Sequence, residues 1–85
     1  MKKYELQEFC QILEVEIGTI SEFINNDWLT LASLENNEFD QEDLARARLV
    51  LDLLETFEVN KEAVPIILHL VDQLNQIRFE LQARS

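Results

Sequence analysis

Hydrophobic residues recur with one unbroken helical period in the last third of the chain, NKEAVPIILHLVDQLNQIRFELQAR at 60–84. About 25 helical residues at a 1.5 Å rise would span roughly 37 Å, which exceeds the packed diameter of so small a domain. The pattern therefore predicts a long C-terminal helix, 61–83, whose distal end extends past the core. The 3-4 spacing places its apolar residues in one stripe, made of Ile67, Leu70, Leu74, Ile77 and Leu81.

This overhanging stripe has two interpretations, and the sequence leaves both open. In the first, the last turns of a core helix fray into solvent. In the second, Leu74, Ile77 and Leu81 pair antiparallel with a second copy of the chain, so that the protein forms a homodimer.

Two short amphipathic stripes near the N-terminus predict two closely joined helices. The first helix is expected over about 5–14 and the second over about 17–26, an order typical of a helix-turn-helix. The apolar positions that define them are Leu6, Phe9, Cys10 and Leu13 in the first helix and Ile17, Ile20, Phe23 and Ile24 in the second.

A third helix is expected over 41–57. Asp40 is a suitable N-cap, because its carboxylate can accept a hydrogen bond from a free backbone N–H of the first turn. Glu42 and Asp43 lie in that turn, where the helix dipole favours negative charge. The apolar surface is broad enough for the central buried element and comprises Leu44, Ala47, Leu49, Val50, Leu51, Leu53, Leu54 and Phe57.

The stretch NNDWLTLASLENNEF, at 25–39, alternates poorly for a helix. Asn36 and Asn37 tolerate turn geometry, so residues 31–34 and 38–39 are expected as the arms of a small hairpin. This hairpin would form a wing over about 29–39.

Together these elements predict one all-α domain over 1–85, a winged helix-turn-helix of four helices with a short wing and a long C-terminal helix. Hydrophobic content of 47% supports a compact core, and one Gly and one Pro favour helices over a many-stranded sheet. A chain of this size buries only about 60–65% of the surface that it exposes when unfolded. A deep enzymatic cleft is therefore not expected.

Charge is distributed unevenly along the chain. Seventeen acidic and seven basic side chains give a formal net charge of −10, and no Lys, Arg or His lies between Tyr4 and Ala45. This acidic N-terminal half, residues 4–45, should repel DNA. It either keeps a small protein in solution or forms a docking face for a basic partner. Its eleven carboxylates belong to Glu5, Glu8, Glu14, Glu16, Glu22, Asp27, Glu35, Glu38, Asp40, Glu42 and Asp43.

Motifs that support catalysis or metal binding are missing from the sequence. It contains no glycine-rich phosphate loop, no Cys/His cluster and no DxDxDG calcium loop, so we expect neither an enzyme nor a cofactor nor a metal. His69 has no second ligand at metal-binding spacing and is expected to be structural or exposed. Cys10, the only cysteine, is expected to be a small buried hydrophobe.

The N-terminus has two lysines with no apolar segment after them, and no run of apolar residues approaches the length of a membrane span. We therefore expect neither a secretory signal nor contact with a membrane. A cytoplasmic protein is predicted, and a lone cysteine fits a reducing compartment.

The order helix, turn, helix, wing and long helix resembles the DNA-binding domain of the MerR family of regulators. That family usually carries arginines in its second helix and wing, whereas ISEFINNDWL at 20–29 and TLASLENNEF at 30–39 contain none. DNA binding by a MerR-like transcriptional regulator is therefore an alternative at odds with the charge. A helical dimerisation module of some other assembly is a further alternative.

A closer resemblance, to the CbpM family of MerR-like chaperone modulators, covers most of the chain. Members of that family bind the J-domain of a CbpA- or DnaJ-like co-chaperone and inhibit its work with Hsp70. The resemblance implies a stoichiometric inhibitor that occludes the J-domain surface needed by Hsp70. The segments that carry it are LQEFC at 6–10, TISEFINNDWL at 19–29, FDQEDLARARLVLDLLETFEVN at 39–60 and AVPIILHLVDQLNQIR at 63–78.

The resemblance gives the acidic N-terminal half a partner, because J-domains present a basic helix to Hsp70. We expect carboxylates of the first two helices and the wing to cover that helix, with an aromatic side chain near the centre. For Trp28 the interpretation as an anchor of the wing to the core is favoured over ligand binding, because large aromatic residues are mostly buried. The residues expected at this interface are Glu14, Glu16, Glu22, Phe23, Asp27 and Trp28. A second placement uses the third or last helix, where Arg46, Asp72, Gln73 and Arg78 belong to the matching segments.

Overall fold

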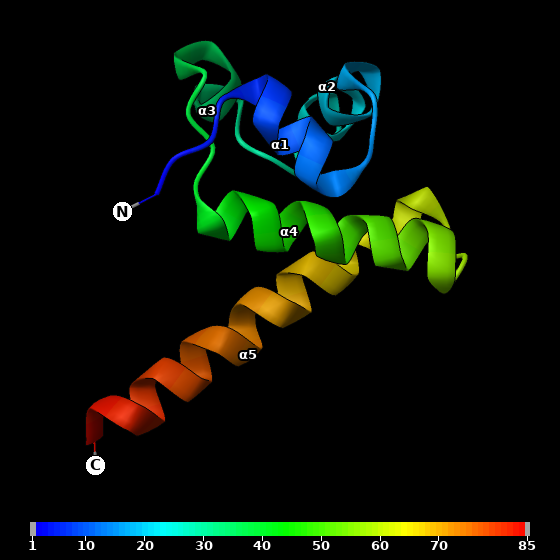
Figure 1. Cartoon of the computed structure of the whole chain (residues 1–85). Helices are drawn as coiled ribbons and strands as arrows, with labels where there is room; N and C mark the ends of the chain where they lie inside the picture. Colours follow the sequence, from blue (N-terminus) through cyan, green and yellow to red (C-terminus); the bar gives the residue numbers. More distant parts are fainter. Residues whose placement is uncertain (1, 85) are drawn as a thin grey trace.

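The computed structural model describes residues 2–84, which form five α-helices, two short helical turns and no strand. The helix α4 lies between α1–α3 on one side and α5 on the other (Figure 1). The all-α helix-turn-helix class expected from the sequence is confirmed. The helices are α1 (Leu6–Leu13), α2 (Ile17–Asn25), α3 (Leu31–Asn36), α4 (Gln41–Leu51) and α5 (Val64–Arg84), with a π-helical turn η1 (Asp52–Thr56) and a 3₁₀ turn η2 (Lys61–Ala63).

The turn between α1 and α2 is tight because Glu14 ends α1 in the left-handed conformation, with φ of 58°. The backbone N–H of Val15 then donates to the carbonyl of Cys10 at 3.0 Å, which satisfies one of the last carbonyls of the helix. Only three residues separate the two helices. This connection gives the helix-turn-helix its compact form.

The segment expected as a hairpin wing is instead the short helix α3, so this part of the prediction is wrong. Asn37 adopts the left-handed conformation, φ 51°, and ends the helix, with its N–H bonded to the Leu34 carbonyl. Its side-chain Oδ1 also accepts from the backbone N–H of Leu6 at 2.7 Å. The asparagines, which favour turns, therefore end the helix α3, and the side chain of Asn37 connects this helix to α1. Extended pairing is limited, among residues 2–84, to the isolated bridge between Tyr4 and Phe39.

Asp40 caps α4 as its position predicts. Its carboxylate accepts from the backbone N–H of Asp43 at 2.8 Å, and the Asp43 carboxylate accepts from the backbone N–H of Asp40 at 3.1 Å. Ser33 donates a further hydrogen bond to Asp43 at 2.9 Å, which connects α3 to the start of α4. The N-terminus of α4 is thus fixed from two sides.

The face of α4 that carries Ala47 and Val50, both fully buried, lies in the core and continues into η1 at Leu53. The expected helix over 41–57 changes character at Asp52, where the π-helical turn closes with the Phe57 N–H bonded to the Asp52 carbonyl. This wider turn rotates the side chains that follow. Phe57, expected in the core, is consequently 69% exposed.

The long helix α5 enters the core only with its first turns. Pro65 is its second residue, where a missing backbone N–H costs no internal hydrogen bond. Val64 and Leu68 are buried, whereas the residues from Asp72 to Ala83 are exposed. The radius of gyration is 13.8 Å, against about 11.9 Å expected for a compact chain of this length. The predicted overhang of the distal end is therefore present (Figure 1).

Aromatic rings dominate the centre of the core. Phe9 of α1 stacks on Phe39 with ring centroids 4.3 Å apart, and both side chains are fully buried. Cys10 is buried as expected, and burial raises the pKa of its thiol. The remaining members of the core are Tyr4, Leu13, Ile20, Phe23, Ile24, Trp28, Leu29, Ala47, Val50, Val64 and Leu68.

We expect Asp40→Ala to lower the free energy of unfolding by about 1 kcal/mol, because it removes the cap of the central helix. Hydrogen bonding from the backbone N–H of Asp43 lowers the pKa of Asp40 below its ordinary 3.8. A lowered folded-state pKa stabilises the fold above that ordinary value, and the stabilisation disappears as pH falls through the folded value. Urea unfolding at pH 7 and pH 3 measures both effects.

Asp40→Asn is the control for this prediction, because Asn caps helices about as well as Asp but does not titrate. It should keep most of the stability at pH 7 and reduce the loss between pH 7 and pH 3. Equal stability of Asp40→Ala and the wild-type chain at pH 7 would contradict the assigned cap.

Candidate functional site

Four of the carboxylates expected to bind a partner are exposed at the two ends of α2. Glu14 and Glu16 lie in the turn before it, Glu22 lies in its last turns, and Asp27 follows it. Glu14 and Asp27 both have positive φ, 58° and 60°, so each stands where the chain turns sharply. The tight connections of the helix-turn-helix therefore place these charges at its surface.

The aromatic residues expected at the centre of that interface are in the core. Phe23 is 2% exposed and Trp28 4% exposed, and their rings meet edge to face with centroids 5.6 Å apart. The helical period explains Phe23, because it shares one face of α2 with the buried Ile20 and Ile24. Neither ring is therefore exposed in the single chain, and the burial of Trp28 agrees with its expected role as an anchor of this loop to the core.

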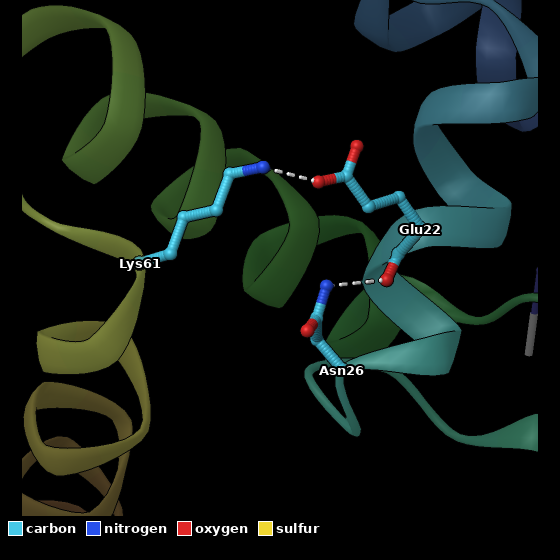
Figure 2. A network of polar contacts seen from close by, with 3 residues as sticks. All are labelled: Glu22, Asn26 and Lys61. Carbon is cyan, nitrogen blue, oxygen red and sulfur yellow. Dashed lines mark hydrogen bonds and ion pairs between the residues drawn. The ribbon is translucent and has the colours of Figure 1, made fainter.

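Glu22 already has a partner within the chain (Figure 2). Its Oε1 lies 2.6 Å from Nζ of Lys61, which joins α2 to the turn that precedes α5. The side-chain amide of Asn26 donates to the Glu22 carbonyl at 2.9 Å. The hydrogen bond that Lys61 donates to the Glu22 carboxylate, and then the negative charge of that carboxylate, raise the pKa of Lys61 above its ordinary value. Glu22 is thus a partly neutralised carboxylate.

A groove of about 1150 Å³ lies between the α2–α3 connection, α4 and α5. It gathers four carboxylates, those of Asp27, Glu42, Asp43 and Asp72. Arg46 lies in the same groove and forms an ion pair with Asp72 at 2.7 Å, which joins α4 to α5. The lining consists of residues 26–31, then Glu42, Asp43, Ala45, Arg46 and Leu49 of α4, and Pro65, Leu68, His69, Val71, Asp72 and Asn75 of α5.

Only part of this groove was expected from the sequence. The expected interface contained Asp27 and Trp28, and the second placement contained Arg46 and Asp72, but no local pattern connects these two pairs. They meet because α5 crosses α4. The other residues of the second placement, Gln73 and Arg78, are exposed further along α5 and do not line the groove.

A row of exposed apolar side chains follows α5 beyond the core, and we call it the α5 stripe. At 3.6 residues per turn its members fall within about 80° of one another and roughly 140° around the helix from Val64 and Leu68. The expected dimerisation residues are therefore exposed in the single chain, and Ile77, for example, is 53% exposed. The α5 stripe comprises Ile66, Leu70, Leu74, Ile77 and Leu81, so the exposed Ile66 takes the place of Ile67, which was expected in the stripe but is half-buried.

Residues 2–84 offer neither a metal site nor a helix that could span a membrane. No three side chains of His, Cys, Asp or Glu among them form a group that could hold a metal ion. Their helices include none with the length and apolar character needed to cross a lipid bilayer.

Comparison with protein families matches residues 4–83 to the family described as MerR HTH family regulatory protein. The match spans nearly the whole chain, and the chain belongs to this family. No curated protein and no solved structure matches the sequence. The fold and the family agree, since both contain a helix-turn-helix.

We expect Glu22→Gln to lower the pKa of Lys61 toward the ordinary value of lysine, because it removes the charge that stabilises the ammonium. A raised folded-state pKa stabilises the fold below the ordinary value, and the stabilisation disappears as pH rises through the folded value. NMR titration of the Lys61 side chain measures the shift. Glu16→Gln, which removes an exposed charge without this partner, should leave the Lys61 pKa unchanged; an equal shift in both variants would contradict the pair.

Proposed function

We propose that this chain is a regulatory protein that acts by binding a basic surface of another protein. The observation that carries the proposal is the combination of a helix-turn-helix with no Lys, Arg or His from Tyr4 to Ala45. Phosphate contacts from cations supply most of the affinity of DNA-binding proteins, so this helix-turn-helix is poorly suited to DNA. An acidic surface favours a partner of opposite charge.

The resemblance to the CbpM family supports a more specific partner, the J-domain of a CbpA- or DnaJ-like co-chaperone. The acidic N-terminal half would cover the basic J-domain helix that Hsp70 uses. Inhibition would then follow from occlusion in a stoichiometric complex, in the cytoplasm, without any covalent step. This mechanism needs no catalytic residue, cofactor or metal.

Calorimetric titration with the J-domain of a CbpA-like co-chaperone tests this function. We expect saturable binding whose affinity falls at high salt, because screening weakens attraction between opposite charges. Binding that does not depend on salt would place the contact on apolar surface. Absence of binding would overturn the J-domain as the partner.

We further propose that the protein forms a homodimer through the α5 stripe. Contiguous exposed apolar residues on one helix face typically mark an interaction surface. An antiparallel pairing of two α5 helices would bury the same stripe twice, as an isologous interface requires. This proposal rests on exposure and pattern in the single chain.

We expect the wild-type protein to sediment as a dimer at tens of micromolar and the Leu74→Glu, Ile77→Glu variant to sediment as a monomer, since two charges in the stripe oppose burial. Gln76→Glu adds a charge to α5 outside the stripe and should leave the dimer intact. A monomeric wild-type protein at this concentration would exclude the pairing.

A further inference from the structure

The groove between the α2–α3 connection, α4 and α5 is larger and more open than a pocket for a small molecule, which usually encloses about 300–1,000 Å³. We propose that it is the docking site for a basic amphipathic helix of the protein partner. This inference rests on the proposed function and specifies where the partner binds: the centre of the interface lies in the groove, which Trp28 lines and Phe23 does not.

The dimensions of the groove fit a helical segment. Two turns of α-helix, about 10.8 Å long and about 10 Å wide, occupy roughly 850 Å³. The groove holds about 1150 Å³. Apolar side chains from three elements line it, and among them Leu31 is exposed whereas Leu49 and Val71 are half-buried. An incoming apolar side chain would thus find partners in a concave site, as the anchors of protein interfaces require.

The charges of the groove select the partner. Within residues 2–84, the carboxylates of Asp27 and Glu42 make no hydrogen bond or ion pair, and both side chains are exposed. The other two carboxylates are already engaged, Asp72 with Arg46 and Asp43 with the cap of α4. Two uncompensated negative charges therefore remain, contributed by different elements. Lysine or arginine on the polar face of a bound helix would complement them.

This groove is a better docking site than the turn between α1 and α2. Glu14 and Glu16 offer charge there, but Glu22, the acidic residue of α2 itself, already pairs with Lys61 (Figure 2). The groove combines free carboxylates with apolar lining. Aromatic, aliphatic and charged contacts in one concave site are the usual anatomy of an interface centre.

The side chain of Trp28 provides an NMR signal that reports on this site. Trp28, the only tryptophan, lines the groove, and its indole Nε1 has no hydrogen-bond partner within residues 2–84. Its indole N–H gives a single resolved signal in an amide NMR spectrum. Occupation of the groove should shift that signal.

The experiment titrates two probes into the full chain and follows the Trp28 indole signal and the backbone amides. One probe is the J-domain of a CbpA-like co-chaperone; the other is a synthetic helix of about 14 residues with Leu at 3-4 spacing and Lys elsewhere. We expect both to shift Trp28 together with amides of the α2–α3 connection, α4 and the first half of α5.

Two charge-matched variants locate the contact. Asp27→Asn, Glu42→Gln removes the free carboxylates of the groove, and Asn tolerates the left-handed conformation at position 27. Glu14→Asn, Glu16→Gln removes the same charge outside the groove and also replaces a left-handed residue. We expect the groove variant to lose about tenfold in affinity at low salt and the control variant less than about threefold.

The outcomes separate the docking site from the proposed function. The J-domain could bind without shifting the Trp28 signal and with an equal loss of affinity in both variants. This outcome would support the proposed function and contradict the groove as the docking site. If the J-domain does not bind, the result with the synthetic helix is decisive. A shift of the Trp28 signal, together with a loss of affinity in the groove variant but not in the control variant, would support the groove as a docking site for a different partner. If neither probe shifts the Trp28 signal, the proposal that the groove is a docking site is also wrong.

Discussion

Burial of α4 between the helix-turn-helix and α5 is the constraint on which the rest of the structure depends. Ala47 and Val50 are both fully buried, and the small side chain of Ala47 permits the close approach of a neighbouring helix. The capped start of α4 fixes its direction, because Asp40 and Asp43 satisfy each other's backbone N–H groups. Every other element either packs on this helix or is connected to one that does.

The same arrangement creates both candidate interaction surfaces. Since, among residues 64–83, α5 contributes only Val64 and Leu68 to the buried core, most of its length projects from the body (Figure 1). The angle at which it crosses α4 opens the groove on one side, held by the ion pair of Arg46 and Asp72, and leaves the α5 stripe exposed. A small domain thus presents an acidic concave surface and an apolar helix face in different places.

The fold is that of a regulatory family. Its surface side chains, however, do not suit DNA, with which helix-turn-helix domains are usually associated. A fold does not determine a function, which depends on the chemistry of the site. Here the site is acidic, with a net charge of −10 for the whole chain and no cation before Arg46 except Lys2 and Lys3. Electrostatics therefore favours recognition of a basic protein surface over a nucleic acid.

The sequence by itself determined the helical class, the tight helix-turn-helix, the cap at Asp40 and the overhang of the last helix, because periodicity, capping and charge are local properties. The tertiary structure decided which faces are covered. Phe57 is exposed and Trp28 buried, although each is a large aromatic residue, and Glu22 meets a lysine 39 residues away. Such outcomes depend on the π-helical turn that follows α4, which exposes Phe57, and on the packing of distant elements against one another, which no local pattern encodes.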